Sequence, residues 1–324
     1  MCHSKELEKD LRDEWHSACG GSIINVESII AELRDRGLIR ESPPERYQAR
    51  QRGRYGDIAW RTPEESERAT ASDFDSPKIE LPRLPLRIID VDDFDSSGFS
   101  SCVADQGTDA LAWYNPYHYF GLKSWGIHIP EDSIYYVAKE VLGNFPSDPR
   151  TLQLRLRASF LLLFRHEFFH FLTEIGASVL ELEMPSPARD VYNNYDVKVY
   201  SRPTQPTQPL EEALANARSY SSFKHSPIGR ELAGINANVI SQIEHFMDRQ
   251  PPGYSDYKKY DRHFTLGRRE LAACLCTGSS GARPLEPLEI LLGPNSADVR
   301  INDVPLYIRR TVHPKKSSSA QIWY

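Results

Sequence analysis

The chain has 324 residues, a formal net charge of -6 and a hydrophobic content of 40%, values that are typical of a globular enzyme. The acidic balance excludes a nucleic-acid-binding surface over the whole chain, although a local basic patch could still exist. No apolar run is long enough to span a membrane without charges, and no signal peptide is apparent, so we expect no membrane association. The five scattered cysteines favour reduced thiols and a cytoplasmic location.

The N-terminal part, residues 1–83, is rich in charge and predicts a partly helical module followed by a linker. Helices are expected over 6–17 and 26–36, the second closed by Gly37 as its C-cap. This part could be a small winged-helix or partner-binding module. Its arginine run, Arg46–Arg54, could contact phosphates, but acidic residues accompany it and favour a solvated face.

Residues 84–278 are predicted to form the main domain, which begins with a small sheet. The segments 84–91, 110–120 and 125–129 have the composition of strands, and a helix is expected over 133–142. The acidic residues after the first strand lack the spacing of a calcium loop, so we interpret them as a solvated strand end.

The longest apolar segment, Leu152–Leu172, predicts a core helix. Asp148 can cap it, Pro149 suits its first turn, and neither Gly nor Pro interrupts it. Apolar side chains surround it on nearly every side, as expected for a buried helix. The polar residues inside this segment would be costly to bury without partners.

Two histidines and a glutamate in this helix belong to the motif His166-Glu167-Phe168-Phe169-His170, an HExxH sequence. Residues four apart share one helix face, so His166 and His170 can bind one metal ion, while Glu167 can reach a water on that metal. Neutral imidazoles suit zinc. Glu174, four residues further on, could support His170 or face solvent.

A third ligand is expected from a second helix over 210–217, which follows a proline-rich segment. Glu212 and Asn216 are four apart and share a face. We expect Glu212 to be the third ligand and Asn216 to fix a ligating imidazole by a hydrogen bond. Glu211 is the rival for the ligand position.

The two segments together resemble the gluzincin-type metallopeptidases, the thermolysin-like enzymes, in which HExxH on one helix is followed by Glu-x-x-x-Asp on the next. The resemblance covers His166, Glu167, His170 and Glu212, with Asn216 where the family usually has aspartate. It implies an α+β fold with a zincin-like core, in which a small mixed sheet packs on the HExxH helix. It also implies bound Zn²⁺ and hydrolysis of a peptide bond, with Glu167 as the general base that takes a proton from a zinc-bound water.

A further donor usually stabilises the oxyanion in such a site. His263 and His245 are the first candidates for this catalytic role. Three other residues are considered for it: Tyr220, His225 and Tyr260.

Beyond the second motif, helices are predicted over 228–249 and 266–276. Residues 279–324 are expected to form a small β-rich appendage, because short apolar runs at 285–292, 299–301 and 304–308 alternate with turns.

Two functions follow from this sequence. The first is a zinc-dependent intracellular metallopeptidase that acts on a protein or peptide substrate. The second is a zinc-binding regulatory protein without catalysis, whose terminal segments bind a protein or, less favoured, a nucleic acid. The intact Glu167 favours the first.

Overall fold

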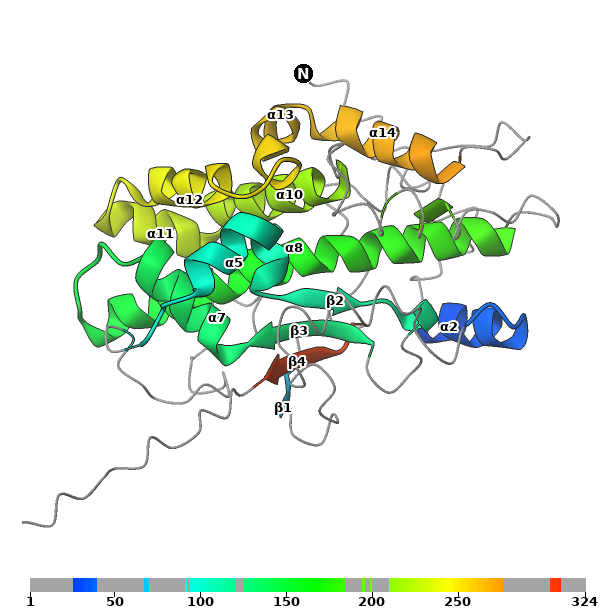
Figure 1. Ribbon diagram of the computed structural model, residues 1–324, viewed down its shortest axis with the longest axis horizontal. Coiled ribbons are helices and arrows are strands. Elements are labelled where there is room, and N and C mark those ends of the chain that lie inside the picture. The colour runs from blue at the N-terminus through cyan, green and yellow to red at the C-terminus, as the bar shows by residue number, and fades with distance from the viewer. Residues whose placement is uncertain are drawn as a thin grey trace, which may run out of the picture.

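The computed structural model describes residues 26–39, 67–69, 91, 94–119, 125–183, 194–195, 199, 210–276 and 304–309. These residues form a mostly helical structure with one small mixed sheet, so the coarse α+β class is confirmed (Figure 1). Within them, no helix combines the length and the apolar character that crossing a membrane requires.

Helix α8, Pro149–Glu183, is the central element and lies between the sheet and a second group of helices (Figure 1). Its 35 residues give it a length of about 50 Å. Asp148 accepts a hydrogen bond from the backbone N–H of Thr151 at 3.0 Å, which confirms the expected cap. Because α8 is covered on both sides, its apolar residues are buried around its whole circumference, as the composition predicted.

The helices on one side of α8 hold the second motif. They are α10 (Leu210–His225), α11 (Pro227–Ile235), α12 (Val239–Asp248), α13 (Tyr257–Arg262) and α14 (Phe264–Cys276). Helix α10 packs directly on α8. Its buried Ala213, Ala215 and Ala217 permit close approach, and Ser219 donates a hydrogen bond to the carbonyl of Leu162 at 2.6 Å.

The sheet on the other side of α8 has the strand order β1-β4-β3-β2. Its strands are β1 (Glu67–Ala69), β2 (Trp113–Asn115), β3 (Gly126–Pro130) and β4 (Leu306–Arg309). Strand β4 runs parallel to β3 and antiparallel to β1, and β2 runs antiparallel to β3. Gly126, at φ 124, starts β3 where a Cβ would lie 2.3 Å from the carbonyl oxygen of Pro305. Only glycine allows this approach of the two strands.

The sheet contains strands from all three of the predicted parts. Strand β4 belongs to the proposed C-terminal appendage and β1 to the proposed N-terminal module, yet both lie in the same sheet as β2 and β3. Strand β4 is fully buried there. Burial on both faces explains the apolar run at 304–308, which a peripheral strand would not need.

Helix α2, Val26–Asp35, also joins the core instead of standing apart. Its buried Val26, Ile30 and Leu33 belong to the main apolar cluster, and the guanidinium of Arg36 donates to the carbonyl of Leu182 near the end of α8 at 3.1 Å. Gly37 ends the helix at φ 68, as predicted.

Other predicted boundaries change. The strand expected over 110–120 is limited to β2, because the 3-10 helix η5 (Gly107–Ala110) precedes it. The helix expected over 228–249 is divided into α11 and α12, where Asn236 accepts a hydrogen bond from the backbone of Asn238 at 2.9 Å in an Asx turn. The helix predicted over 133–142 is present as α7 (Glu131–Tyr136) followed by the π-helix η6 (Val137–Val141). Four predictions lie wholly outside the described residues: the helix over 6–17, the arginine run, and the strands over 285–292 and 299–301. Of the strand predicted over 84–91, the structure describes only residue 91.

Candidate metal centre

Four buried residues from three separate elements bring their ligand atoms within 4.8 Å of one another and could hold a metal ion. Helix α8 supplies His166 and His170, helix α10 supplies Glu212, and η5 supplies Asp109. The close packing of α10 on α8 is what joins the two sequence motifs. The structure therefore brings together the three ligands expected from the sequence and adds a fourth residue.

Three of these donor atoms form a triangle with equal sides. Nε2 of His166 is 3.3 Å from Nε2 of His170, and Oε2 of Glu212 is 3.3 Å from each of them. A tetrahedral ion with bonds of about 2.0–2.1 Å separates its ligand atoms by about 3.3–3.4 Å. The triangle thus has the size of one face of a tetrahedral coordination sphere.

Asn216 determines which nitrogen of His166 faces this triangle. Its Nδ2 donates to the backbone carbonyl of Tyr254 at 3.0 Å, and a carbonyl can only accept, which fixes the orientation of the amide. Its Oδ1 therefore lies 2.8 Å from Nδ1 of His166, so Nδ1 carries the proton and donates. The lone pair of Nε2 then points to the metal position.

A buried network holds Asn216 in this orientation. Gln250 accepts a hydrogen bond from Nδ2 of Asn216 at 2.9 Å and one from the hydroxyl of Thr108 at 3.1 Å. The same hydroxyl lies 3.1 Å from Oδ1 of Asn216. The ring of Tyr254 also stacks on His166, with an interplanar angle of 11°. Asn216 therefore orients an imidazole, the role expected of it from the sequence.

The neighbouring glutamates Glu211 and Glu212 face different nitrogens of His170. Nε2 of His170 faces Glu212, whereas Nδ1 lies 3.2 Å from Oε1 of Glu211. Glu211 thus has the position that fixes the orientation of a ligating histidine, and Glu212 has the position of a ligand. Burial raises the pKa of Glu211, although His170 opposes the shift.

Glu167 is buried next to the cluster, and neither of its carboxylate oxygens has a hydrogen-bond partner among the described residues. Burial raises its pKa to about 7, against the opposing charges of His166 and His170. A buried carboxyl group without partners is costly to the fold. Groups held in this way, with a pKa near neutrality, are typical of general bases.

Without a metal, the charged groups of the cluster strongly shift one another's pKa values. Burial lowers the pKa of His166, but contacts with Asp109 and Glu212 outweigh this effect and raise it to about 9. For Glu212, burial and Asp109 raise the pKa, yet the two histidines hold it well below its usual range. Protons on the imidazoles thus supply the positive charge that a metal ion would otherwise bring.

Glu174 has a role different from both of those expected. It is fully buried, and it accepts hydrogen bonds from the hydroxyl of Tyr114, from the backbone of Tyr117 and from Nδ1 of His118, the last at 2.8 Å. Both ring nitrogens of His170 face other groups. Glu174 therefore anchors the segment after β2 to α8.

The structure does not place the predicted oxyanion donors at the cluster. His263 is exposed after α13, and His225 is exposed at the end of α10. The hydroxyls of Tyr220 and Tyr260 donate to Glu244 and Glu270.

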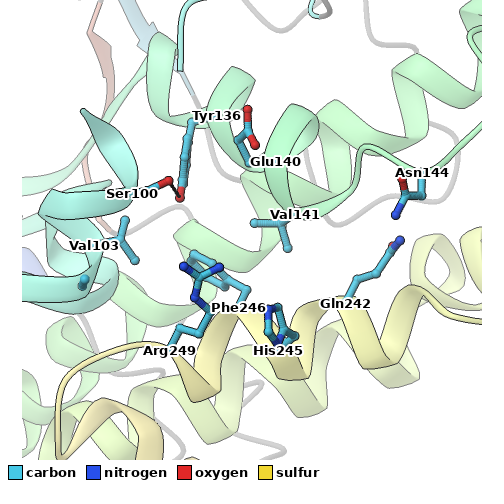
Figure 2. A pocket seen from close by; sticks show the side chains of 11 residues that line it. Ser100, Val103, Tyr136, Glu140, Val141, Asn144, Gln242, His245, Phe246 and Arg249 are labelled. Atoms are coloured by element: carbon cyan, nitrogen blue, oxygen red, sulfur yellow. Dashed lines mark hydrogen bonds between the residues drawn. The ribbon is translucent and has the colours of Figure 1, made fainter. Parts of the chain in front are cut away.

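His245, the other first candidate, is exposed on α12. It lines a separate pocket between α12, α5 (Phe99–Gln106) and η6, together with Arg249 and Glu140 (Figure 2). The expectation that His245 or His263 acts in the site is therefore wrong, because exposed side chains on these helices cannot join the buried cluster.

Asp109 is the residue that the sequence did not reveal. Its Oδ1 lies 3.7 Å from Nε2 of His166, and it is buried in η5. No periodic spacing relates Asp109 to the HExxH motif, so only the tertiary structure could identify it.

No protein-family model, no curated protein and no solved structure matches the chain. The chemistry of the site therefore has to be inferred from its own geometry.

Proposed function

We propose that this protein is a zinc-dependent peptidase that hydrolyses a peptide bond with Glu167 as the general base. The observation that carries the proposal is the triangle of donor atoms with sides of 3.3 Å beside a buried carboxyl group that has no hydrogen-bond partner among the described residues.

The donor set supports zinc over the hard cations. Two imidazole nitrogens and one carboxylate are ligands typical of a zinc enzyme, whereas Mg²⁺ and Ca²⁺ take six or more oxygen ligands. The sides of the triangle also agree with zinc bond lengths. The order HExxH followed by Glu-x-x-x-Asn is the pattern that resembles the gluzincins, and α8 and α10 carry it on two packed helices.

Each residue then has a defined task. His166, His170 and Glu212 hold the metal, and Asn216 and Glu211 orient the two imidazoles. Zinc supplies a Lewis acid that polarises the scissile carbonyl and acidifies water. Glu167, whose pKa is about 7, can accept a proton from the attacking water at neutral pH and pass it to the leaving amine.

A second candidate function is metal binding without catalysis. The observation that favours it is Asp109, because four protein ligands are typical of structural zinc sites, whereas catalytic sites keep one position for water.

Metal analysis and peptide cleavage distinguish the two functions. We expect the purified protein to bind one zinc ion and to cleave members of a peptide library. Glu167→Gln should retain the metal and lose cleavage, whereas Glu212→Gln should lose both. Glu270→Gln, a change at a half-buried glutamate on α14, is the control and should retain both. Metal without cleavage would support the second function, and absence of metal would reject both.

A further inference from the structure

Asp109 lies close to the one coordination position that the other three ligands leave open. His166, His170 and Glu212 define one face of a tetrahedron, and a carboxylate oxygen of Asp109 lies within 4.8 Å of a ligand atom of each of these three residues. Its distance of 3.7 Å from Nε2 of His166 is only slightly longer than the sides of that face. In a hydrolytic zinc site this position belongs to water.

The backbone that carries Asp109 is anchored to the same network that orients His166. The hydroxyl of the preceding Thr108 lies 3.1 Å from both Asn216 and Gln250. Gly107 has φ 67, and a Cβ at this position would lie 2.5 Å from the ring of Tyr254. The segment therefore fits tightly against the site, so a change in the position of the carboxylate must come from rotation of the Asp109 side chain.

The charge of the site also favours a bound aspartate. Within the set of ligands, neutral imidazoles leave the two positive charges of a zinc ion uncompensated, whereas the carboxylates of Asp109 and Glu212 together balance them. Charge balance matters here because all four residues are buried, and an unbalanced buried charge is costly.

We infer that Asp109 is a fourth protein ligand that occupies the water position, so that the resting site is latent until the Asp109 side chain rotates away. The inference deepens the proposed function and rests on the same metal site. The position of the Asp109 side chain then determines whether the metal has a free coordination position. If the open state has a population of 10% or less, as is common for minor states, removal of Asp109 raises turnover about tenfold or more.

The test uses the full chain loaded with cobalt(II), whose visible absorption spectrum reports coordination number and ligand exchange. Azide is the probe for an accessible position on the metal. We expect azide to leave the spectrum of the unaltered protein nearly unchanged and to shift the spectra of Asp109→Ala and Asp109→Asn. Asp109→Asn preserves the size of the side chain and guards against misfolding of the alanine variant. Asp105→Ala, which removes an exposed carboxylate on α5, should behave as the unaltered protein does.

The outcomes separate this inference from the proposed function. An equal azide response in the unaltered protein and in both Asp109 variants would show an open position and would overturn the inference, even if peptides are cleaved. An azide response confined to the Asp109 variants supports the inference. If those opened variants bind metal but cleave no peptide, the inference holds and the proposed peptidase function fails.

Discussion

Asn216 accepts a hydrogen bond from Nδ1 of His166 at 2.8 Å while its amide nitrogen donates to the carbonyl of Tyr254 at 3.0 Å. This pair explains why the position requires an amide and not a carboxylate. A carboxylate could accept from His166, but it could not donate to Tyr254. The hydrogen bond to the carbonyl of Tyr254 therefore requires an amide at position 216.

The substitution Asn216→Asp should therefore destabilise the protein, although it changes only the amide group. Two oxygens would face each other where the amide now donates to Tyr254, and such a buried unsatisfied acceptor costs about 1–3 kcal/mol. The midpoint of denaturant unfolding measures this loss. Asn238→Asp, at an exposed position before α12, should leave the midpoint nearly unchanged. Equal stability of the two variants would contradict the assigned orientation of the amide.

Glu211 and Glu212 should differ in their effect on metal binding. Glu211→Gln changes a group beside Nδ1 of His170, so we expect zinc affinity to fall about 10-fold to 100-fold while one ion still binds at saturation. Glu212→Gln removes a proposed ligand and should abolish stoichiometric binding. Competition with a chromogenic chelator measures both affinities. If Glu211→Gln had the larger effect, the two assignments would have to be exchanged.

The metal-free protein should lose stability as the pH rises from 6.5 to 9. Burial lowers the pKa of His166, but Asp109 and Glu212 raise it from 6.5 to about 9. Because the folded state holds this proton more tightly than the unfolded chain, the stabilisation is complete below pH 6.5 and is lost as the pH rises through about 9.

Zinc should reverse the sign of this pH dependence, because it binds the deprotonated imidazole and the stabilisation it confers grows as the pH rises. Thermal unfolding with a chelator and with zinc, at several pH values in this range, measures both trends. His166→Gln should weaken both of them. A metal-free protein that becomes more stable between pH 6.5 and 9 would disprove the contacts assigned to His166.

The position of β4 beside β3 can be tested with two glycines. Gly126→Ala should be the more destabilising change, because it combines a positive φ with a Cβ only 2.3 Å from the carbonyl oxygen of Pro305. Gly37→Ala meets no atom within 4 Å in the described part of the chain, so it should cost only the left-handed conformation, about 1–2 kcal/mol. Chemical denaturation gives both values. Equal losses would contradict the close approach of the two strands.

The part of the site that the sequence predicted depends on helical periodicity. The spacing of four places His166 with His170 and Glu212 with Asn216, because residues on one helix have fixed relative positions. Periodicity does not decide which neighbour each face meets. For this reason the sequence allows Glu174 to support His170 or to face solvent, whereas the structure buries it against His118.

The part that the sequence could not predict depends on contacts between distant segments. Asp109 reaches the site through the packing of η5 against Asn216 and Gln250. No local sequence pattern predicts such a contact. The composition of residues 304–308 predicts strand β4. Its pairing with β3 joins segments far apart in the sequence, which composition does not determine. The tail was consequently assigned to a separate appendage.

The central claim is that one metal ion binds where His166, His170 and Glu212 converge. Anomalous diffraction at the zinc absorption edge, from crystals of the full chain grown with zinc, tests it most directly. We expect one strong peak about 2.0–2.1 Å from Nε2 of both histidines and from a carboxylate oxygen of Glu212. A zinc-loaded crystal with no peak at this position, or with its peak at other residues, would show that these three residues do not form the metal site.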